Sequence, residues 1–460
     1  MNMSAEGNFE DILQRYEQYI SKQEKGYFDV EELEQIADYY LWKGRTKDSS
    51  KAIDLGLKIH PGSAALLTKR AKIYTAMGQY DKALQLLNQR PDGNDIETSL
   101  LKGEILILLN RYTESDRLFT SILQDNTIEI DSLCLDIAYL YLTSQAFDRS
   151  LKYLHKGILF NPKNIDILFE LAFCYEQTAQ YEKCIETHNR IIDLRPYSGE
   201  TWFNLGQVYF MLHNYEKAIE AYDYASIINE NDSGAFLQKA HAFFQSERYE
   251  EAIDSYRNYA AMTEYKSAVF VYIGECYEKL EQFDNALHSY QESLSFDETN
   301  IEALTGIVIC YLEKEAYRKS VNYALKALEF SPDSSELWVY IAEAYLNLDE
   351  AENAIAAYKS ALDINPEQED TLIALANIHL ELKEYNLSLE YYLKAFELDQ
   401  EAENIHLLLA ANYFKLNQLD TSLLFLEDAV KKDPNASSLF FDICPEAEKQ
   451  FEQFIKPNKP

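Results

Sequence analysis

Histidine, cysteine and carboxylate side chains are the groups in this 460-residue chain that could do chemistry, and their spacing decides whether they do. The chain has 8 His but no His-Glu-x-x-His pattern, in which two imidazoles one helical turn apart bind zinc beside a general base. It has 6 Cys but no Cys-x-x-Cys pair, so neither a zinc site nor a disulfide framework is indicated. Gly-rich phosphate-binding loops and the Gly-x-Ser-x-Gly elbow of hydrolases are also missing. We therefore expect no catalytic constellation, no cofactor and no metal.

Carboxylates dominate the charge of the chain. Asp and Glu number 77 against 42 Lys and Arg, a formal net charge of −35 at pH 7. Such a surface repels a phosphate backbone and anionic lipid, so nucleic acid is excluded as a default partner. Because acidic pairs are everywhere in the chain, their proximity carries little information about acid–base catalysis. A metal site formed by Glu31, Glu34 and Asp38 on one helix face is a minor alternative.

The composition favours helices over strands. Only 14 Gly and 10 Pro occur in the chain, too few for the many turns of an all-β or loop-rich α/β protein. No apolar run approaches the roughly 18 to 20 residues that a membrane helix needs, so direct membrane insertion is not expected. The first residues carry acids at Glu6, Glu10 and Asp11 in place of the basic start of a secretory signal. These features favour a cytoplasmic protein; whether a targeting segment has been removed is left open.

A repeat of 34 residues organises the sequence. In the frame that begins at Gly199, positions 4, 7, 8, 11, 20, 24 and 27 are Trp202, Leu205, Gly206, Tyr209, Ala218, Tyr222 and Ala225. Nine consecutive frames share this spacing and begin at Asp131, Ile165, Gly199, Ser233, Ser267, Ile301, Ser335, Glu369 and Glu403. Three looser frames precede them at Val30, Ala64 and about Ile96. Positions 4, 7, 8 and 11 form one face of a first helix and positions 20, 24 and 27 one face of a second, so each frame predicts an antiparallel helix pair.

Other positions of the frame predict how the pair closes. Small residues at positions 8 and 20, such as Ala342 with Ala354, indicate a close approach of the two backbones, where a larger side chain would overpack. An aromatic residue recurs at position 17 and is expected to anchor the start of the second helix: Tyr80, Tyr112, Phe147, Tyr181, Tyr215, Tyr249, Phe283, Tyr317 and Tyr385.

The register resembles the tetratricopeptide repeat (TPR) family, whose pattern is Trp-x-x-Leu-Gly-x-x-Tyr, then Ala-x-x-x-Phe, then Pro. The resemblance covers residues 30–436, about twelve repeats. It implies an all-α fold, a right-handed superhelical α-solenoid of stacked antiparallel helix pairs. Such stacks need sealed ends. Residues 1–29 are accordingly predicted to form an N-terminal capping helix, and residues 437–460 a C-terminal capping helix with a short tail that carries Phe451, Phe454 and Ile455.

Several frames depart from the family pattern. Arg70 and Lys239 occupy the apolar position 7. The histidines at signature positions are expected to have hydrogen-bonded packing roles: His188, His379 and His406. Three cysteines share position 10, which indicates packing and not a nucleophile: Cys174, Cys276 and Cys310.

The resemblance also implies a binding surface. In the family, positions 2, 5, 9, 12 and 13 of the first helix line a concave groove that binds peptides. Frames four to seven present a mostly apolar and aromatic set there, with a histidine among them: Leu135, Tyr139, Phe169, Phe173, Phe203, Phe210, Leu237, His241 and Phe244. Later frames present acids, among them Glu275, Glu278 and Glu343. The alternative is that the aromatics pack between repeats and the acids only keep the surface solvated.

These features predict a non-enzymatic protein-interaction scaffold whose partners are proteins or peptides with apolar anchors and basic residues. A second hypothesis is an accessory assembly or regulatory subunit of an envelope, secretion or other multiprotein complex, recruited through its convex face or ends. The oligomeric state is left open.

Overall fold

The computed structural model describes residues 3–22, 26–88, 95–124, 129–402 and 404–448. The chain falls into two compact units, Met1–Leu212 and His213–Pro460. Within the described residues every regular element is helical and no strand occurs. None of the described helices combines the length and the apolar character that crossing a membrane requires.

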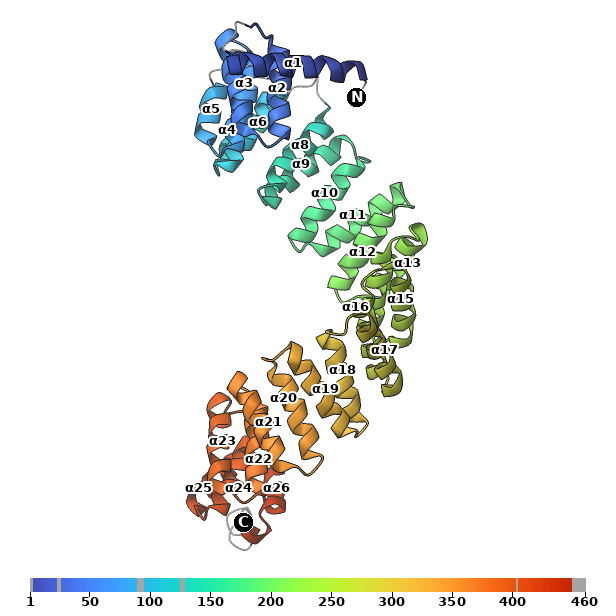
Figure 1. Cartoon of the computed structure of the whole chain (residues 1–460), viewed down its shortest axis with the longest axis vertical. Helices are drawn as coiled ribbons and strands as arrows, with labels where there is room; N and C mark the ends of the chain where they lie inside the picture. The colour runs from blue at the N-terminus through green and yellow to red at the C-terminus, as the bar shows by residue number, and fades with distance from the viewer. Residues whose placement is uncertain (1–2, 23–25, 89–94, 125–128, 403, 449–460) are drawn as a thin grey trace. The chain divides into compact units, whose positions relative to one another are not determined.

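The first unit is a series of helices joined by short turns (Figure 1). They are α1 (Met3–Lys22), α2 (Val30–Trp42), α3 (Thr46–Ile59), α4 (Ala64–Ala76), α5 (Tyr80–Asn88), α6 (Ile96–Leu108), α7 (Tyr112–Ile122), α8 (Ile130–Leu142), α9 (Phe147–Phe160), α10 (Ile165–Gln177), α11 (Tyr181–Leu194) and α12 (Gly199–Met211). From α2 onward the helices pack as pairs, α2 with α3 up to α10 with α11, and each second helix also contacts the first helix of the next pair.

The second unit continues the same pattern. It contains α13 (Tyr215–Ile228), α14 (Ser233–Gln245), α15 (Tyr249–Met262), α16 (Lys266–Lys279), α17 (Phe283–Phe296), α18 (Ile301–Glu313), α19 (Tyr317–Phe330), α20 (Ser335–Leu346), α21 (Ala351–Ile364), α22 (Glu369–Glu381), α23 (Tyr385–Leu398), α24 (Ile405–Lys415), α25 (Leu419–Lys432), α26 (Ala436–Ile443) and the 3-10 turn η1 (Pro445–Ala447). Pairs run from α14 with α15 to α24 with α25. The predicted all-α, superhelical repeat fold of stacked helix pairs is thereby confirmed.

The helix boundaries follow from the residues at the turns. Each of the nine aromatic residues at position 17 is the first residue of a second helix, as predicted. Several first helices are capped by the side chain just before them: Asn164 accepts a hydrogen bond from the backbone N–H of Ile167, and Asn300 from that of Ala303. Such caps satisfy backbone donors that a helix start leaves unpaired, so they fix where the helix begins.

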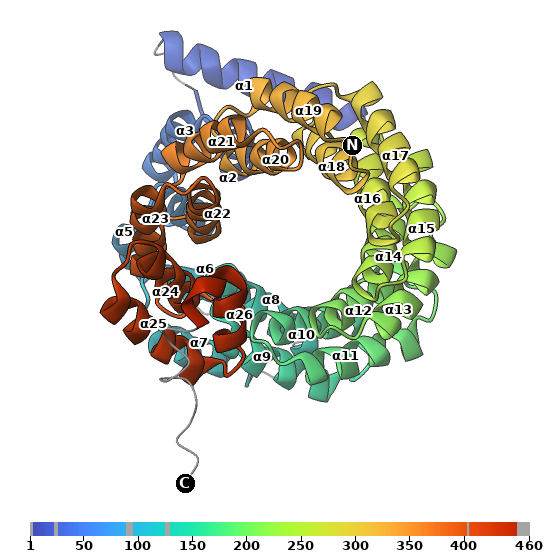
Figure 2. The same cartoon turned by 90° about the horizontal axis from the view of Figure 1, so that it is seen from below.

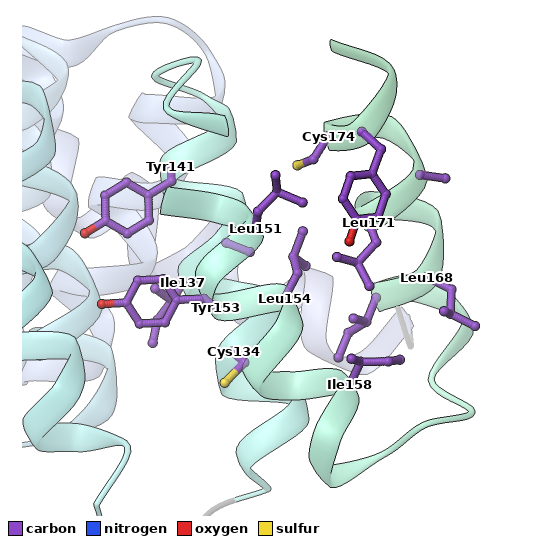
Figure 3. Packing of buried hydrophobic residues seen from close by; sticks show 14 of the residues in the cluster. Cys134, Ile137, Tyr141, Leu151, Tyr153, Leu154, Ile158, Leu168, Leu171 and Cys174 are labelled. Carbon is purple, nitrogen blue, oxygen red and sulfur yellow. The ribbon is translucent and has the colours of Figure 1, made fainter. Parts of the chain in front are cut away.

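The core of the first unit lies between successive helix pairs (Figure 3). Tyr141 of α8 and Tyr153 of α9 stack with their ring centroids 5.6 Å apart, and both are buried. Their hydroxyls donate hydrogen bonds to Asp116 Oδ1 of α7, at 2.8 and 2.9 Å. Arg149 forms an ion pair with the same carboxylate. One partly buried acid therefore ties the pair α8–α9 to the helix before it.

The charged residues at position 7 are paired within the stack. Arg70 of α4 contacts Asp54 Oδ1 of α3 at 3.0 Å, and Lys239 of α14 forms an ion pair with Asp223 of α13. Each cation therefore lies between a first helix and the preceding second helix, where its aliphatic stem packs and its charge is neutralised.

Close approach of helices is visible around Tyr290 of α17. This ring is 1% exposed and lies against Gly274 of α16 and Gly306 of α18. A Cβ atom at Gly274 would lie 2.5 Å from Tyr290 Cε1, closer than a carbon–carbon contact allows. Ala342 and Ala354 are likewise fully buried. A larger side chain at Gly274, position 8 of its frame, would therefore overpack as predicted, and the close approach of the two backbones stays a prediction.

Both ends of the chain bury apolar residues against the adjacent pairs. Tyr16 of α1 packs edge-on against Phe28, 5.8 Å between ring centroids. Phe440 of α26 packs in the same way against Phe414 of α24 at 6.0 Å. The division into a cap of residues 1–29, repeats of residues 30–436 and a cap of residues 437–460 stays a prediction. The helix expected to carry Phe451, Phe454 and Ile455 lies outside the described residues.

Within each unit the first helices lie side by side. In the first unit α6, α8 and α10 contact one another in sequence, and in the second unit α16, α18 and α20 do so. In Figure 2, α8 and α10 lie on the inner side of the curve of their unit, with α9 and α11 outside them. Helices α14, α16, α18 and α20 lie inside α15, α17, α19 and α21 in the same way. The first helices, which carry the predicted groove residues, therefore lie on the inner side of each unit.

Candidate functional site

The aromatic candidates of the first unit lie on three first helices. Leu135 and Tyr139 belong to α8, Phe169 and Phe173 to α10, and Phe203 and Phe210 to α12. Tyr139 and Phe173 are 42% and 44% exposed, whereas the other four are partly buried. Leu135 and Phe169 pack against the core cluster of this unit, so part of the set also holds the repeats together. Two of the six candidates thus remain open to a partner over much of their surface.

Glu170 joins this set through Tyr139. The two side chains share a hydrogen bond across α8 and α10, and partial burial raises the pKa of the Glu170 carboxyl. The same contact and burial raise the pKa of Tyr139 to about 12. A carboxylate held next to aromatic rings in a partly desolvated place is a strong acceptor for a cationic or hydroxyl-bearing ligand.

A cavity of about 430 Å³ opens between α10 and α12 of the first unit. Its lining comes from three successive helices: Phe169, Glu170, Phe173 and Glu176 of α10, His188 of α11, and Glu200 and Asn204 of α12. Two predicted groove residues, Phe169 and Phe173, are therefore brought together with three carboxylates and an imidazole. Five of the seven lining residues are polar or charged, so the cavity suits a polar or cationic side chain flanked by two rings more than an apolar one.

Three further candidates lie on α14 in the second unit: Leu237, His241 and Phe244. His241 is partly buried, and its Nδ1 lies 2.7 Å from the hydroxyl of Tyr256. Its ring also packs edge-on against Tyr272 at 5.2 Å, and burial lowers the pKa of its imidazole. Phe244 packs against Tyr249 at 5.4 Å, and Leu237 is partly buried. Packing accounts for much of the surface of these three residues.

The acidic candidates lie on α16 and α20. Glu278 accepts hydrogen bonds from the Tyr290 hydroxyl and, at 3.4 Å, from Cys310 Sγ. Burial raises the pKa of the Glu278 carboxyl, and burial together with repulsion by Glu278 raises that of Glu275. Partial desolvation also raises the pKa of Glu343. Glu275 and Glu278 repel each other and all three carboxyls are partly desolvated, so added positive charge would stabilise them.

A second cavity, of about 310 Å³, lies between α18 and α20. It is lined by Ile309, Leu312, Glu313, Tyr317, Tyr340, Glu343 and Asn347. The hydroxyl of Tyr340 donates a hydrogen bond to Glu336 Oε1 at 2.8 Å, which turns the ring along the helix. Glu343 is thus a predicted groove residue that faces a cavity.

Both cavities include residues that the sequence did not indicate. Asn204 and Tyr340 occupy position 6 of their frames, next to the groove positions chosen from the family pattern. The signal that could have found them is the same 34-residue register, because position 6 of one first helix faces position 9 of the preceding one across the cavity.

The acidic side chains and thiols of the described chain do not form a metal site or a reactive nucleophile. In the described part of the chain no group of three or more His, Cys, Asp or Glu side chains could hold a metal ion. Asp38, one of the three acids considered for such a site, pairs with Lys69 Nζ at 2.5 Å. All 6 Cys are buried free thiols, and burial raises the pKa of Cys174 to about 11 and of Cys276 to about 12. A thiol with a raised pKa is a poor nucleophile at neutral pH.

The three histidines at signature positions differ from one another. His379 is buried and its Nδ1 lies 2.6 Å from Glu384 Oε2, and the ring of His406 packs against Phe396 and Phe425. His188 is 3% exposed, but its Nδ1 has no hydrogen-bond partner. The hydrogen-bonded packing role expected for His188 is therefore wrong in one respect, because the ring packs without a partner for that nitrogen.

Stacked helix pairs with an accessible face of first helices define the class of helical repeat proteins. Four models of the tetratricopeptide repeat match the chain, over residues 199–232, 237–300, 335–378 and 369–401. With the 34-residue register and the paired helices, these matches show that the chain belongs to the tetratricopeptide repeat proteins. The number of twelve repeats stays a prediction, since the models match only part of the chain. No curated protein matches it.

Solved structures with a similar arrangement of helices share little sequence with the chain. One is described as the APC/C hetero-tetramer Cut9-Hcn1, at 15% identity and TM-score 0.36, covering 84% of this chain and 96% of that chain. The C-terminal part of a TPR repeat-containing protein from Cytophaga hutchinsonii has 19% identity and TM-score 0.44, covering 50% and 95%. YrrB, described as a TPR protein with an unusual peptide-binding site, has 20% identity and TM-score 0.35, covering 41% and 98%. No partner or activity follows from these likenesses for this chain.

Proposed function

We propose that this protein is a non-enzymatic scaffold that binds extended protein segments along the accessible face of its first helices. The observation that carries the proposal is the cavity between α10 and α12, where groove positions of one repeat meet those of the next. A segment that runs along such a face places successive side chains in successive cavities, so affinity accumulates over several repeats.

The chemistry of the face indicates what the segment contains. Phe173 and Tyr139 offer exposed rings for apolar anchors. Glu275, Glu278 and Glu343 offer carboxylates whose raised pKa values report burial and, for Glu275, repulsion by neighbouring acids. A cationic side chain would relieve that cost, so basic residues are favoured over acidic ones. Nucleic acid is not proposed as a partner, because a net charge of −35 opposes it.

The cytoplasm is the proposed location, a compartment that keeps thiols reduced. Its support is that all 6 Cys are free thiols buried inside the stack.

Proteins of this repeat family generally act as non-enzymatic scaffolds, and this chain is proposed to do the same.

The test is selection of random dodecapeptides by the full chain, followed by affinity measurement with one exposed ring changed. Phe173→Glu places a charge on the accessible face of α10 and is expected to weaken selected peptides by about tenfold or more, the loss of an aromatic anchor. Phe160→Glu is the matched control, because Phe160 is 57% exposed but ends the second helix α9. Equal binding by both variants, with circular dichroism unchanged, would show that the first helices are not the binding face.

A second candidate function is an accessory subunit that assembles into an envelope, secretion or other multiprotein complex through its second helices. Large apolar side chains are exposed there: Leu159 and Phe160 of α9 at 79% and 57%, and Ile227 of α13 at 64%. Exposed apolar residues on one side of a helix can mark a contact with another protein. Crosslinks from the purified complex that map to these helices, with none on α10 or α12, would favour this function over the first.

A further inference from the structure

The second helices of the second unit carry a recurrent tyrosine whose hydroxyl reaches the inner face. Tyr256 contacts His241 Nδ1 at 2.7 Å, Tyr290 donates a hydrogen bond to Glu278, and Tyr392 donates one to Asn377. All three tyrosines occupy position 24 of their frames and are at most 1% exposed. Each phenol therefore fills the space between a first and a second helix and ends on a groove side chain of its own repeat.

In the first unit the same position on α11 is His188. An imidazole is shorter than a phenol and does not reach the face of α10. The cavity of about 430 Å³ lies at this place, with His188 in its lining. His188 is only 3% exposed, and its Nδ1 is buried without a hydrogen-bond partner.

The charge of the cavity is one-sided. Glu170 and Glu176 of α10 and Glu200 of α12 line it, and no described Lys or Arg forms an ion pair with any of the three. Burial lowers the pKa of His188 to about 4, so the imidazole is neutral at physiological pH and adds no positive charge. Neutral imidazole has one nitrogen that accepts a hydrogen bond and one that donates. The cavity therefore offers carboxylate acceptors, an imidazole and two aromatic walls.

We propose that the His188 cavity receives the side chain of an arginine from the extended partner segment. The flat guanidinium has five N–H donors, pairs with carboxylates through two parallel hydrogen bonds and stacks on aromatic rings. Phe169 and Phe173 supply the rings, Glu170, Glu176 and Glu200 supply the carboxylates, and His188 forms part of the wall.

Other side chains fit the cavity less well. An acidic side chain is repelled by three carboxylates, and an apolar one would desolvate those carboxylates. A lysine neutralises charge but presents a compact ammonium that cannot bond several separated acceptors at once. The inference rests on the proposed function, since it names one residue of the segment that the inner face binds.

The experiment compares dodecapeptides selected by the full-length wild-type chain with those selected by His188→Tyr. The substitution installs the residue that five other repeats accommodate as a buried ring, so the fold is expected to persist and the cavity to be filled. Wild type is expected to enrich arginine at one peptide position, and the variant to lose that enrichment while it still selects the other positions. Replacing that arginine with citrulline, which has nearly the same shape and no charge, is expected to weaken wild-type binding by about tenfold.

A second variant keeps the result decisive if His188→Tyr does not fold. Glu176→Gln preserves the size of the side chain and removes one carboxylate charge. It is expected to weaken the arginine peptide several-fold and to leave the citrulline peptide unchanged.

The outcomes separate this inference from the proposed function. If wild type selects no peptide at all, the proposed function itself is wrong. If it selects peptides without arginine enrichment, with lysine enriched equally, or with enrichment that survives both substitutions, only the assignment of the His188 cavity to arginine is overturned.

Discussion

At the scale of single residues, the turn inside each helix pair depends on one residue in the left-handed conformation. Position 15 has a positive φ in ten frames although none of its residues there is glycine, for example Ala179 at 53° and Glu281 at 56°. In the two earliest pairs glycine takes this place, as Gly44 and Gly78, both at 71°. A side chain with a Cβ atom is strained in this region, whereas glycine adopts it freely.

This strain predicts a stabilising substitution. Ala179→Gly is expected to raise the free energy of unfolding by about 0.5 to 1 kcal/mol, because relief of left-handed strain exceeds the added entropy of the unfolded chain. The matched control is Ala356→Gly on the exposed side of α21, which should lower it by about 1 kcal/mol. Urea unfolding followed by circular dichroism measures both. A loss of stability in both variants would show that the turn at Ala179 is not strained.

The sequence could not have predicted this turn. The residues at position 15 include Asn110, Gln145, Ala179, His213, Glu247 and Lys383, which share neither charge nor size. By contrast, the nine aromatic residues at position 17 mark the start of their second helices to the residue, and all nine rings are partly buried there. The starts of these second helices could be predicted from the residue types. The left-handed conformation of the turn residue just before them could not.

At the scale of helices, close contact between neighbours sets the tolerance to larger side chains. Gly274→Ala is expected to destabilise the second unit by about 1 to 3 kcal/mol, because its new Cβ would lie 2.5 Å from the ring of Tyr290, which is itself buried against α18. Gly62→Ala is the control, since no atom lies within 4 Å of the Cβ added there. The urea midpoint of each variant measures the difference. Equal midpoints would mean that α16 and α17 separate at little cost.

The candidate site illustrates what helical periodicity can and cannot predict. The register placed Phe169 and Phe173 on one face of α10, because residues four apart on a helix share a side, and both line the same cavity. It did not predict the cavity beside them, which depends on the size of His188 on α11 and on Glu200 and Asn204 of α12. A periodic pattern within one helix contains no information about the gap that a short side chain leaves on the next.

At the scale of the whole molecule, the excess of acid is expected to govern how fast partners arrive. A net charge of −35 creates a field that attracts a cationic segment over distances comparable to the Debye length. The field acts before contact, so it changes association more than dissociation.

The corresponding prediction concerns salt. For an arginine-containing peptide selected by the full chain, the association rate constant should fall by about tenfold as ionic strength rises from about 0.02 to about 0.3 M, with a much smaller change in the dissociation rate constant. Stopped-flow fluorescence of the labelled peptide measures both rates. The control is the same peptide with its basic residues replaced by citrulline or glutamine, whose association should vary little with salt because it carries no charge for the field to act on. If the basic and neutral peptides associate at the same salt-independent rate, the acidic residues of this protein serve its solubility and do not guide its partner.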